Sequence, residues 1–465
     1  MEYLNKLRLA LASLIIPSYA MGSTVDKQPN IIVIILDDLG LRDVSFNGSK
    51  DIITPNIDRI ANEGTHCTNA YVSAPYSGPS RCGIFTGRYQ QRFGAECNIL
   101  DHAESVTQQC GVPKSEMMLT EALKEVGYQT AVIGKWHMGD HVDLKPNMRG
   151  ADYFYGFSNG SFNYWGQPFK GNYIEENNEE VPASKTSYLT DDLTEKSLDF
   201  INMASKSEDP FFLYLSYNAP HAPMQATEQY LERTTHISDA WRSIYAAMIL
   251  GVDDGVGRIW DALESKGIED ETMIIFLSDN GGTNRAMNYP QRSFKGNMYD
   301  GGTKVPFAIY WKEQVPGGKE YNQMISGLDI YPTVTAAAGI KHHKNPLDGT
   351  DLMPFLKGHK KQKPHEQLFF RVSGGFEYAV RDSKYKLVKR YDQPVMLYNL
   401  ENDPYEMIDI ASQNTQRVKS MQADYDDWNA QMIKPRWMDD HDKNQIKDNE
   451  FWMMERKRSL KPQKK

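Results

Sequence analysis

Residues Ile31-Ile32-Val33-Ile34-Ile35-Leu36-Asp37-Asp38 carry the strongest strand signal in this 465-residue chain. A continuous run of β-branched and apolar residues is typical of a central parallel strand that is buried on both faces. The run ends in two adjacent aspartates, and open α/β sheets keep their ligand sites at the carboxyl ends of their strands. The stretch therefore predicts a parallel sheet with an acidic site at one edge.

The same arrangement recurs along the chain, where polar side chains follow other apolar runs. Further strands are predicted over 67–73, 129–133, 210–217, 273–277 and 307–311. Helices are predicted over 55–64, 118–126, 190–204, 239–263 and 328–339. This alternation argues for a mostly parallel sheet with helices on both faces, and hence for the α/β fold class.

The pattern changes near residue 360, where a polar, basic linker begins at His359. Short runs typical of a small antiparallel meander follow at 368–372, 377–381, 385–389 and 396–399. One more helix is predicted over 413–432. We therefore expect an N-terminal domain at 27–360 and a C-terminal α+β subdomain at 361–465, which ends in a basic tail.

The N-terminus has the features of a signal peptide at residues 1–22. Lys6 and Arg8 precede a short apolar run, Leu9–Ile16, and Ser18-Tyr19-Ala20 offers a small-residue cleavage site. The run is too short to span a bilayer, although an amphipathic N-terminal helix is the alternative. We expect an exported protein, periplasmic or secreted, with no stable membrane insertion after cleavage.

The net charge and the cysteine spacing argue against a nucleic-acid-binding site and against a cysteine-based zinc site. The net charge of −9 provides no global basic field, which argues against nucleic acid as a partner. The four cysteines contain no CxxC pair, which argues against a cysteine-based zinc site. Three disulfide pairings are possible. We favour Cys97–Cys110, across a polar loop, and expect Cys67 and Cys82 to be buried thiols.

The segment Tyr76–Arg88 is expected to start as a loop and to turn into a short helix that ends near Gly87. Backbone N–H groups at a helix N-terminus favour negative charge, so Ser77 is placed to meet an anion. Arg81 adds a permanent cation with a planar donor fork. The alternative is a turn in which Ser77 or Ser80 only caps the helix.

Several polar clusters follow predicted strands or adjoin them, and in a doubly wound sheet those strand ends converge on one rim. The clusters are Asp37 and Asp38, Ser77 and Arg81, Lys135 and His137, His221, Asp279 and Asn280, and Lys295. Three carboxylates and an amide fit a hard divalent cation, calcium or magnesium rather than zinc. Lysines and an arginine fit a tetrahedral anion, and two histidines fit proton transfer. This inventory predicts metal-assisted hydrolysis of a sulfate or phosphate ester.

Several motifs, in order, resemble those of type I sulfatases between Pro29 and Glu406. The maturation signature is matched by Ser77-Gly78-Pro79-Ser80-Arg81 with Thr86-Gly87-Arg88, and the second signature by Gly134-Lys135-Trp136-His137-Met138-Gly139. Matching stretches also include Asp37-Asp38, Asp279-Asn280-Gly281-Gly282, Lys295 and Asp300–Pro306. Asp300 and Lys304 depart from the pattern, since the family more often has Glu and Arg there. The resemblance implies an alkaline-phosphatase-like sandwich with a smaller antiparallel C-terminal subdomain.

The resemblance also implies a mechanism. Ser77 is the precursor of formylglycine, made by a formylglycine-generating maturation enzyme, and its hydrate attacks the sulfur. One calcium ion per chain is held by residue 77 together with Asp37, Asp38, Asp279 and Asn280. Arg81 steadies the hydrate, Lys135 and Lys295 hold sulfate oxygens, His221 is the general acid for the leaving sugar oxygen, and His137 accepts a proton as sulfate is expelled.

Ser77 is preferred over Cys82 as the modified residue because Pro79 and Arg81 stand at the spacing of the family motif, whereas Ile84 follows Cys82. Two explanations for the serine stay open. The protein uses a serine-dependent maturation route, or Ser77 replaces a natural cysteine in a variant made to trap substrate.

Export, acidic charge and loops at 144–185 rich in aromatic and amide residues predict an extracellular sulfated polysaccharide or oligosaccharide as substrate. The chain is similar to bacterial carbohydrate sulfatases, and a carrageenan-type galactan is favoured, with a glycosaminoglycan next. His102, Arg285, Arg371 and Tyr289 are candidate sugar-binding residues in loops. The alternatives are a phosphatase or phosphonate hydrolase of the same superfamily, and a non-catalytic glycan-binding protein on this scaffold.

Overall fold

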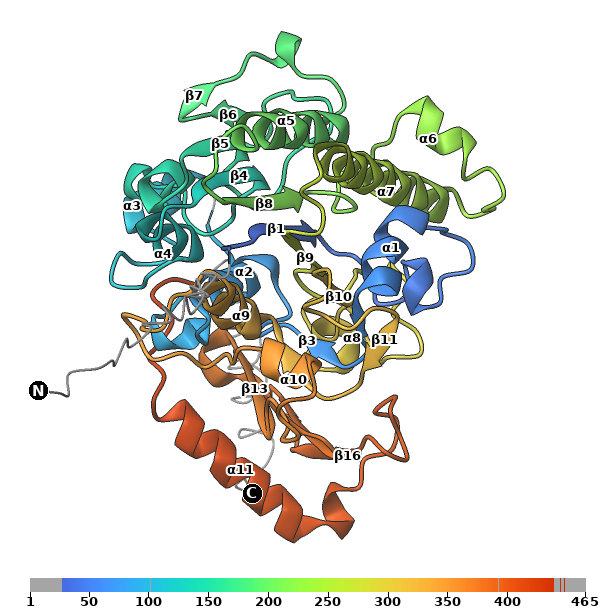
Figure 1. Ribbon diagram of the computed structural model, residues 1–465. Coiled ribbons are helices and arrows are strands. Elements are labelled where there is room, and N and C mark those ends of the chain that lie inside the picture. Colours follow the sequence, from blue (N-terminus) through green and yellow to red (C-terminus); the bar gives the residue numbers. More distant parts are fainter. Residues whose placement is uncertain (1–26, 101, 392, 439–443, 445–446, 448–465) are drawn as a thin grey trace, which may run out of the picture.

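The computed structural model describes residues 27–100, 102–391, 393–438, 444 and 447 (Figure 1). The predicted signal peptide and the basic tail lie outside these residues.

A ten-stranded sheet forms the centre of the larger part of the molecule, and its middle is parallel. Strand β1 (Asn30–Leu36) pairs in parallel with β8 (Phe211–Tyr217) on one side and with β9 (Thr272–Ser278) on the other. Beyond β8, the strands β4 (Gln129–Lys135) and β5 (Tyr153–Phe157) continue the parallel order. The outer strands are β10 (Phe307–Tyr310), β2 (Thr65–Cys67), β11 (Lys319–Tyr321), β6 (Glu175–Glu176) and β7 (Glu179–Glu180).

Helices cover both faces of this sheet (Figure 1). One face carries α1 (Pro55–Glu63), α5 (Leu189–Ala204) and α7 (Ala240–Lys266). The other carries α2 (Ser77–Thr86), α4 (Leu119–Glu125) and α9 (Ile330–Ala337). Successive side chains of β1 alternate between the two cores, with Ile32 and Ile34 in one and Ile31 and Val33 in the other. The continuous apolar run is thus explained by burial on both faces, and the predicted α/β class is confirmed.

The remaining elements of this part are short. They are α3 (His102–Gln108), α6 (Glu228–Glu232), α8 (Asp300–Thr303), α10 (Met353–Leu356), β3 (Ala70–Tyr71) and β12 (Ile325–Ser326). None of the described helices is long and apolar enough to cross a membrane.

Two sequence predictions for this region are wrong. The single strand predicted over 67–73 is split into β2 and β3, and β3 pairs with β12 in a separate two-stranded sheet. Tyr153–Phe157 was expected in a loop, but it is strand β5 of the central sheet. Gly156 lies so close to β4 that a Cβ would stand 2.0 Å from the carbonyl oxygen of Gly134. This glycine therefore permits strand pairing and does not mark a loop.

The C-terminal part contains the predicted antiparallel meander. Its four strands are β13 (Gln367–Val372), β14 (Glu377–Asp382), β15 (Tyr385–Arg390) and β16 (Met396–Asn399). Helix α11 (Thr415–Asn429) packs Met421 and Trp428 onto one face of this sheet. The exact domain boundary at residue 360 stays a prediction.

All four cysteines are buried thiols, and the disulfide favoured between Cys97 and Cys110 is not formed. Both residues belong to the apolar core on the α2 face of the central sheet. Burial raises the pKa of the Cys82 thiol to about 12. The expectation that Cys67 and Cys82 are buried thiols is confirmed.

A buried ionic cluster joins the C-terminal sheet to the central domain. Lys386 of β15 lies 2.7 Å from Asp300 of α8 and 2.9 Å from Glu406. The hydroxyl of Tyr71 and the backbone N–H of Asp300 complete the cluster by donating to Asp300 and Glu406, respectively. Burial raises the pKa of Glu406 to about 7, although Lys386 opposes this shift. Lys386 is therefore the cation that both buried carboxylates share.

Replacing Lys386 with methionine is expected to lower the free energy of unfolding by about 3 kcal/mol, because it leaves buried carboxylates without their shared cation. Denaturant unfolding followed by fluorescence measures the change. The matched control is Lys384→Met, which removes only an exposed pair with Glu401 and should leave the free energy of unfolding almost unchanged. Equal losses in both variants would contradict a special contribution from the buried cluster.

Candidate active site

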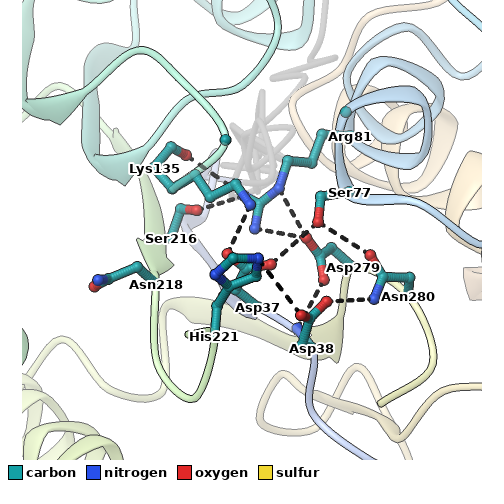
Figure 2. Close-up of polar contacts among 12 residues, drawn as sticks. Asp37, Asp38, Ser77, Arg81, Lys135, Ser216, Asn218, His221, Asp279 and Asn280 are labelled. Atoms are coloured by element: carbon teal, nitrogen blue, oxygen red, sulfur yellow. Dashed lines mark hydrogen bonds and ion pairs between the residues drawn. The ribbon is translucent and has the colours of Figure 1, made fainter. Parts of the chain in front are cut away.

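The carboxyl ends of the four central strands meet at one edge of the sheet, as parallel pairing requires (Figure 2). Strand β1 leads to Asp37 and Asp38, β4 ends with Lys135, and β9 leads to Asp279 and Asn280. Beyond β8 lies His221, and helix α2 brings its first residue, Ser77, to the same place. Residues as far apart in sequence as Asp37 and Asn280 therefore form one site.

Ser77 lies at the centre of this site and is almost completely buried. Its Oγ atom is 3.1 Å from Oδ1 of Asp37 and 3.1 Å from Oδ1 of Asn280 (Figure 2). The hydroxyl carries a single proton, so it donates to only one of these two acceptors at a time. The three oxygen atoms of Ser77, Asp37 and Asn280 therefore lie close together with one hydroxyl proton between them. A bound cation would reduce the repulsion between these oxygen atoms.

Asp38 completes the cluster of oxygen atoms. Its backbone has a φ of 66°, in the left-handed region, and its N–H donates to Oδ1 of Asp279 at 3.2 Å. The amide of Asn280 donates to Asp38 Oδ1 at 2.8 Å. Carboxylate and amide oxygens of this kind are the ligands that calcium and magnesium prefer. The donor set therefore fits a hard divalent cation.

Both aspartates that follow β1 have pKa values below the ordinary range. Burial raises the pKa of Asp37, but its electrostatic interactions with Lys135 and His221 outweigh this effect. Burial acts in the same way on Asp38, and Lys295 and His221 lower its pKa. The two carboxylates are therefore ionised at neutral pH, as cation binding requires.

Arg81 is fully buried and supports the acidic cluster from the side of α2. Its Nε and Nη2 atoms lie 3.0 and 2.8 Å from Asp279 Oδ2. Its Nη1 atom donates to the hydroxyl of Tyr214 and to that of Ser216 (Figure 2), and both of these residues lie on β8. No sequence motif indicated these two hydroxyl residues, since they lie inside an apolar strand. Together they fix the guanidinium, and with it the carboxylate of Asp279.

Two lysines reach the same cluster from different elements. Lys135 Nζ is 2.6 Å from Asp37 Oδ2, and Lys295 Nζ is 2.7 Å from Asp38 Oδ1. Burial lowers the pKa of Lys135, although Asp37 opposes this shift. Burial also disfavours the charge on Lys295, but the nearby carboxylates raise its pKa above the ordinary value. Both ammonium groups border the cavity above Ser77 and are available to an anion there.

The two predicted histidines differ in environment. His137 is buried, and its pKa lies well below the ordinary value because of burial and the charges of Lys135 and Arg81. Its imidazole is therefore neutral, and its Nδ1 has no hydrogen-bond partner among the described residues. His221 is more exposed, and its Nδ1 donates to the carbonyl of Ala222 at 2.6 Å. This leaves His221 Nε2 at the rim, 3.6 Å from Asp38.

A polar cavity of about 190 Å³ opens above these groups. It is lined by Ser77, Asn98, Ile99, Lys135, His137, Asn159, Gly160, Ser161, Lys170, Asn172, His221 and Lys295. Five lining positions lie in the 144–185 segment, which was expected at the site mouth, but the individual residues were not identified from sequence.

Asn98 lines the cavity, although no sequence motif indicated it. Its Oδ1 accepts from the backbone N–H of Gly78, directly after Ser77. Its carbonyl accepts from Trp437 Nε1 at 2.8 Å, so a residue near the C-terminal end of the described chain supports the wall. Only tertiary structure brings these positions together.

Three of the candidate sugar-binding residues, Arg371, Arg285 and Tyr289, do not line the cavity. Arg371 was expected in a loop, but it lies on β13, buried, with its Nη2 2.6 Å from Glu96. Its remaining donors bind Asn429 and the carbonyl of Ile433, so its assignment to the sugar pocket is corrected. Arg285 and Tyr289 are exposed outside the cavity lining, with Arg285 over the ring of Trp241. His102 begins α3, and its side chain lies outside what the structure describes.

The chain is similar to known proteins both in sequence and in structure. The sulfatase family model matches residues 29–340, and a model of the C-terminal region of N-sulphoglucosamine sulphohydrolase matches residues 293–431. The uncharacterized sulfatase YdeN of Escherichia coli K12 is 31% identical, with 85% of this chain and 84% of YdeN covered. Mouse N-acetylgalactosamine-6-sulfatase is 32% identical, with 79% of this chain and 73% of that protein covered.

The fold of this chain is also similar to that of a solved structure. The crystal structure of Ps i-CgsB in complex with k-i-k-neocarrahexaose has a TM-score of 0.83 and 38% sequence identity. The match covers 88% of this chain and 95% of that one. The family model, the curated relatives and the solved structure all indicate the same family. The chain therefore belongs to the sulfatase family and is a sulfuric ester hydrolase.

Proposed function

We propose that the protein hydrolyses a sulfate ester of an extracellular polysaccharide or its oligosaccharides, after Ser77 has been converted to formylglycine. The observation that carries the proposal is the position of Ser77, between oxygens of Asp37 and Asn280 and at the floor of a cavity bordered by Lys135 and Lys295. The amide and hydroxyl groups that line the rest of the cavity suit sugar hydroxyls. The signal peptide predicted at 1–22 would deliver the enzyme to such a substrate.

A carrageenan-type galactan is the substrate class that we favour, with a glycosaminoglycan next. Ps i-CgsB, 38% identical to this chain, was solved with k-i-k-neocarrahexaose, which supports the first choice. The similarity to N-acetylgalactosamine-6-sulfatase supports the second.

Calcium and formylglycine are the groups that the family implies and that these residues fit. Asp37, Asp38, Asp279 and Asn280, together with residue 77, would hold the cation. When both groups are present, the aldehyde hydrate supplies a strong nucleophile and a route for releasing sulfate, and calcium offsets negative charge on the sulfate. A serine hydroxyl alone is a weak nucleophile, and a sulfated serine has no such route of release.

The residues of the chain have separate tasks in this proposal. Lys135 and Lys295 bind sulfate oxygens, and their charges are already aimed at the place where negative charge develops. His221 gives a proton from Nε2 to the leaving sugar oxygen. His137, neutral and with Nδ1 unpartnered among the described residues, accepts a proton as sulfate leaves. Arg81 keeps Asp279 in position.

The proposed function is tested by desulfation of a panel of defined oligosaccharides from carrageenan and from glycosaminoglycans. Protein matured by a formylglycine-generating enzyme should release sulfate over many turnovers, whereas protein with unmodified Ser77 should bind and not turn over. Mass spectrometry of the peptide with residue 77 separates the two forms, since conversion removes two hydrogens. Steady turnover by the unmodified form would refute the mechanism, and faster cleavage of aryl phosphate than aryl sulfate would favour the phosphatase alternative.

Replacing His221 with alanine should affect substrates according to their leaving groups. A sugar oxygen needs a proton as it leaves, so kcat on a sulfated oligosaccharide should fall by about 100-fold or more. 4-Nitrophenyl sulfate has a good leaving group and should lose about tenfold or less. His236→Ala, at an exposed histidine outside the cavity lining, is the control. If kcat decreased equally on both substrates, His221 would not be the general acid.

Calcium should stabilise the folded protein through the acidic cluster. At a calcium concentration 100 times Kd, the free energy of unfolding should rise by about 2.7 kcal/mol. Asp38→Asn should abolish most of this gain, whereas Asp270→Asn, at an exposed carboxylate before the start of β9 and so at the opposite end of this strand from Asp279, should preserve it. Thermal unfolding with and without calcium measures the effect. An unchanged gain in Asp38→Asn would place the calcium elsewhere.

A further inference from the structure

Lys170 differs from the other lysines that line the cavity. Lys135 and Lys295 face carboxylates at 2.6 and 2.7 Å. Lys170 also borders the cavity, yet it forms no ion pair with any carboxylate in the described part of the chain. Its Nζ lies over the ring of Phe169, 5.6 Å from the centroid. The cavity therefore has one cation at its rim whose charge the described residues do not offset with an ion pair.

The backbone holds Lys170 in a tight turn. Phe169 and Asn172 exchange two backbone hydrogen bonds of 2.9 Å, with Lys170 and Gly171 between them in the left-handed region. The side-chain amide of Asn172 donates to the carbonyls of Phe169 and Lys170, each at 3.3 Å. Asn172 also lines the cavity, so two residues of this turn, Lys170 and Asn172, border it.

The charges at the floor of the cavity already form matched pairs. Arg81 pairs with Asp279, Lys135 with Asp37 and Lys295 with Asp38. Calcium, if bound as proposed, adds the positive charge that the sulfate under attack requires. Lys170 belongs to none of these pairs. A substrate with one sulfate would therefore place no anionic group beside the Lys170 ammonium.

We propose that Lys170 forms a second anion subsite and that the preferred substrate carries a second anionic group, sulfate or carboxylate, beside the sulfate that is removed. The inference rests on the proposed function, whose substrate class it narrows to sugars with two closely spaced anionic groups. Because Lys170 lines the same cavity as Lys135 and Lys295, we expect the two groups on the same sugar unit or on adjacent ones.

The test is isothermal titration calorimetry with calcium present and Ser77 unmodified, so that binding is measured without turnover. The probes are neocarrabioses with one sulfate and with two sulfates, and a monosulfated disaccharide that contains a uronic acid. Lys170→Met should weaken binding of at least one two-anion probe by about fivefold at low ionic strength and leave the one-anion probe unchanged. The loss should shrink as salt is added.

Two variants make the result specific. Lys170→Arg should restore most of the affinity, and Lys206→Met, at an exposed lysine outside the cavity lining, should change nothing. A loss confined to the doubly sulfated probe assigns the subsite to sulfate, and a loss confined to the uronic acid probe assigns it to carboxylate. Equal effects on one-anion and two-anion probes, or no binding of any two-anion probe, would overturn the inference. Failure of the proposed function appears separately, as the absence of sulfate release by matured protein.

Discussion

Three carboxylates buried side by side are the constraint on which this structure depends. Asp37, Asp38 and Asp279 are buried at the carboxyl end of the central strands, where an unpaired charge is costly. Each is compensated by one cation, respectively Lys135, Lys295 and Arg81. These cations come from a strand, a loop and a helix, so the charge balance links the elements around the site to one another.

The same constraint suits a site that binds an anion through a metal. The paired lysines keep the carboxylates ionised before any cation is bound, as the lowered pKa values of Asp37 and Asp38 show. Ser77 is held where oxygen atoms outnumber the protons between them. The C-terminal part contributes at a distance: Trp437 supports Asn98, and Asn98 binds the backbone beside Ser77. The two parts of the chain thus cooperate in one site.

Much of this arrangement could be predicted from sequence, because some signals are local. A buried parallel strand reads as a continuous apolar run, and β1, β8 and β9 were recognised in this way. Polar residues directly after such runs identified the rim, since parallel strands end at the same edge. Strand β5 was missed because its glycine and aromatic residues also suit a loop, and their burial depends on both apolar cores.

The sequence by itself determined the class of fold, the family motifs and the residue types gathered at the strand ends, because these depend on periodicity and spacing within short segments. Tertiary structure alone decided which cation meets which carboxylate, that Arg371 binds Glu96 rather than a sugar, and that Lys170 borders the cavity without an ion pair in the described chain. The physical reason is that ion pairing and burial depend on distances between segments that are remote in sequence, and no local pattern encodes those distances.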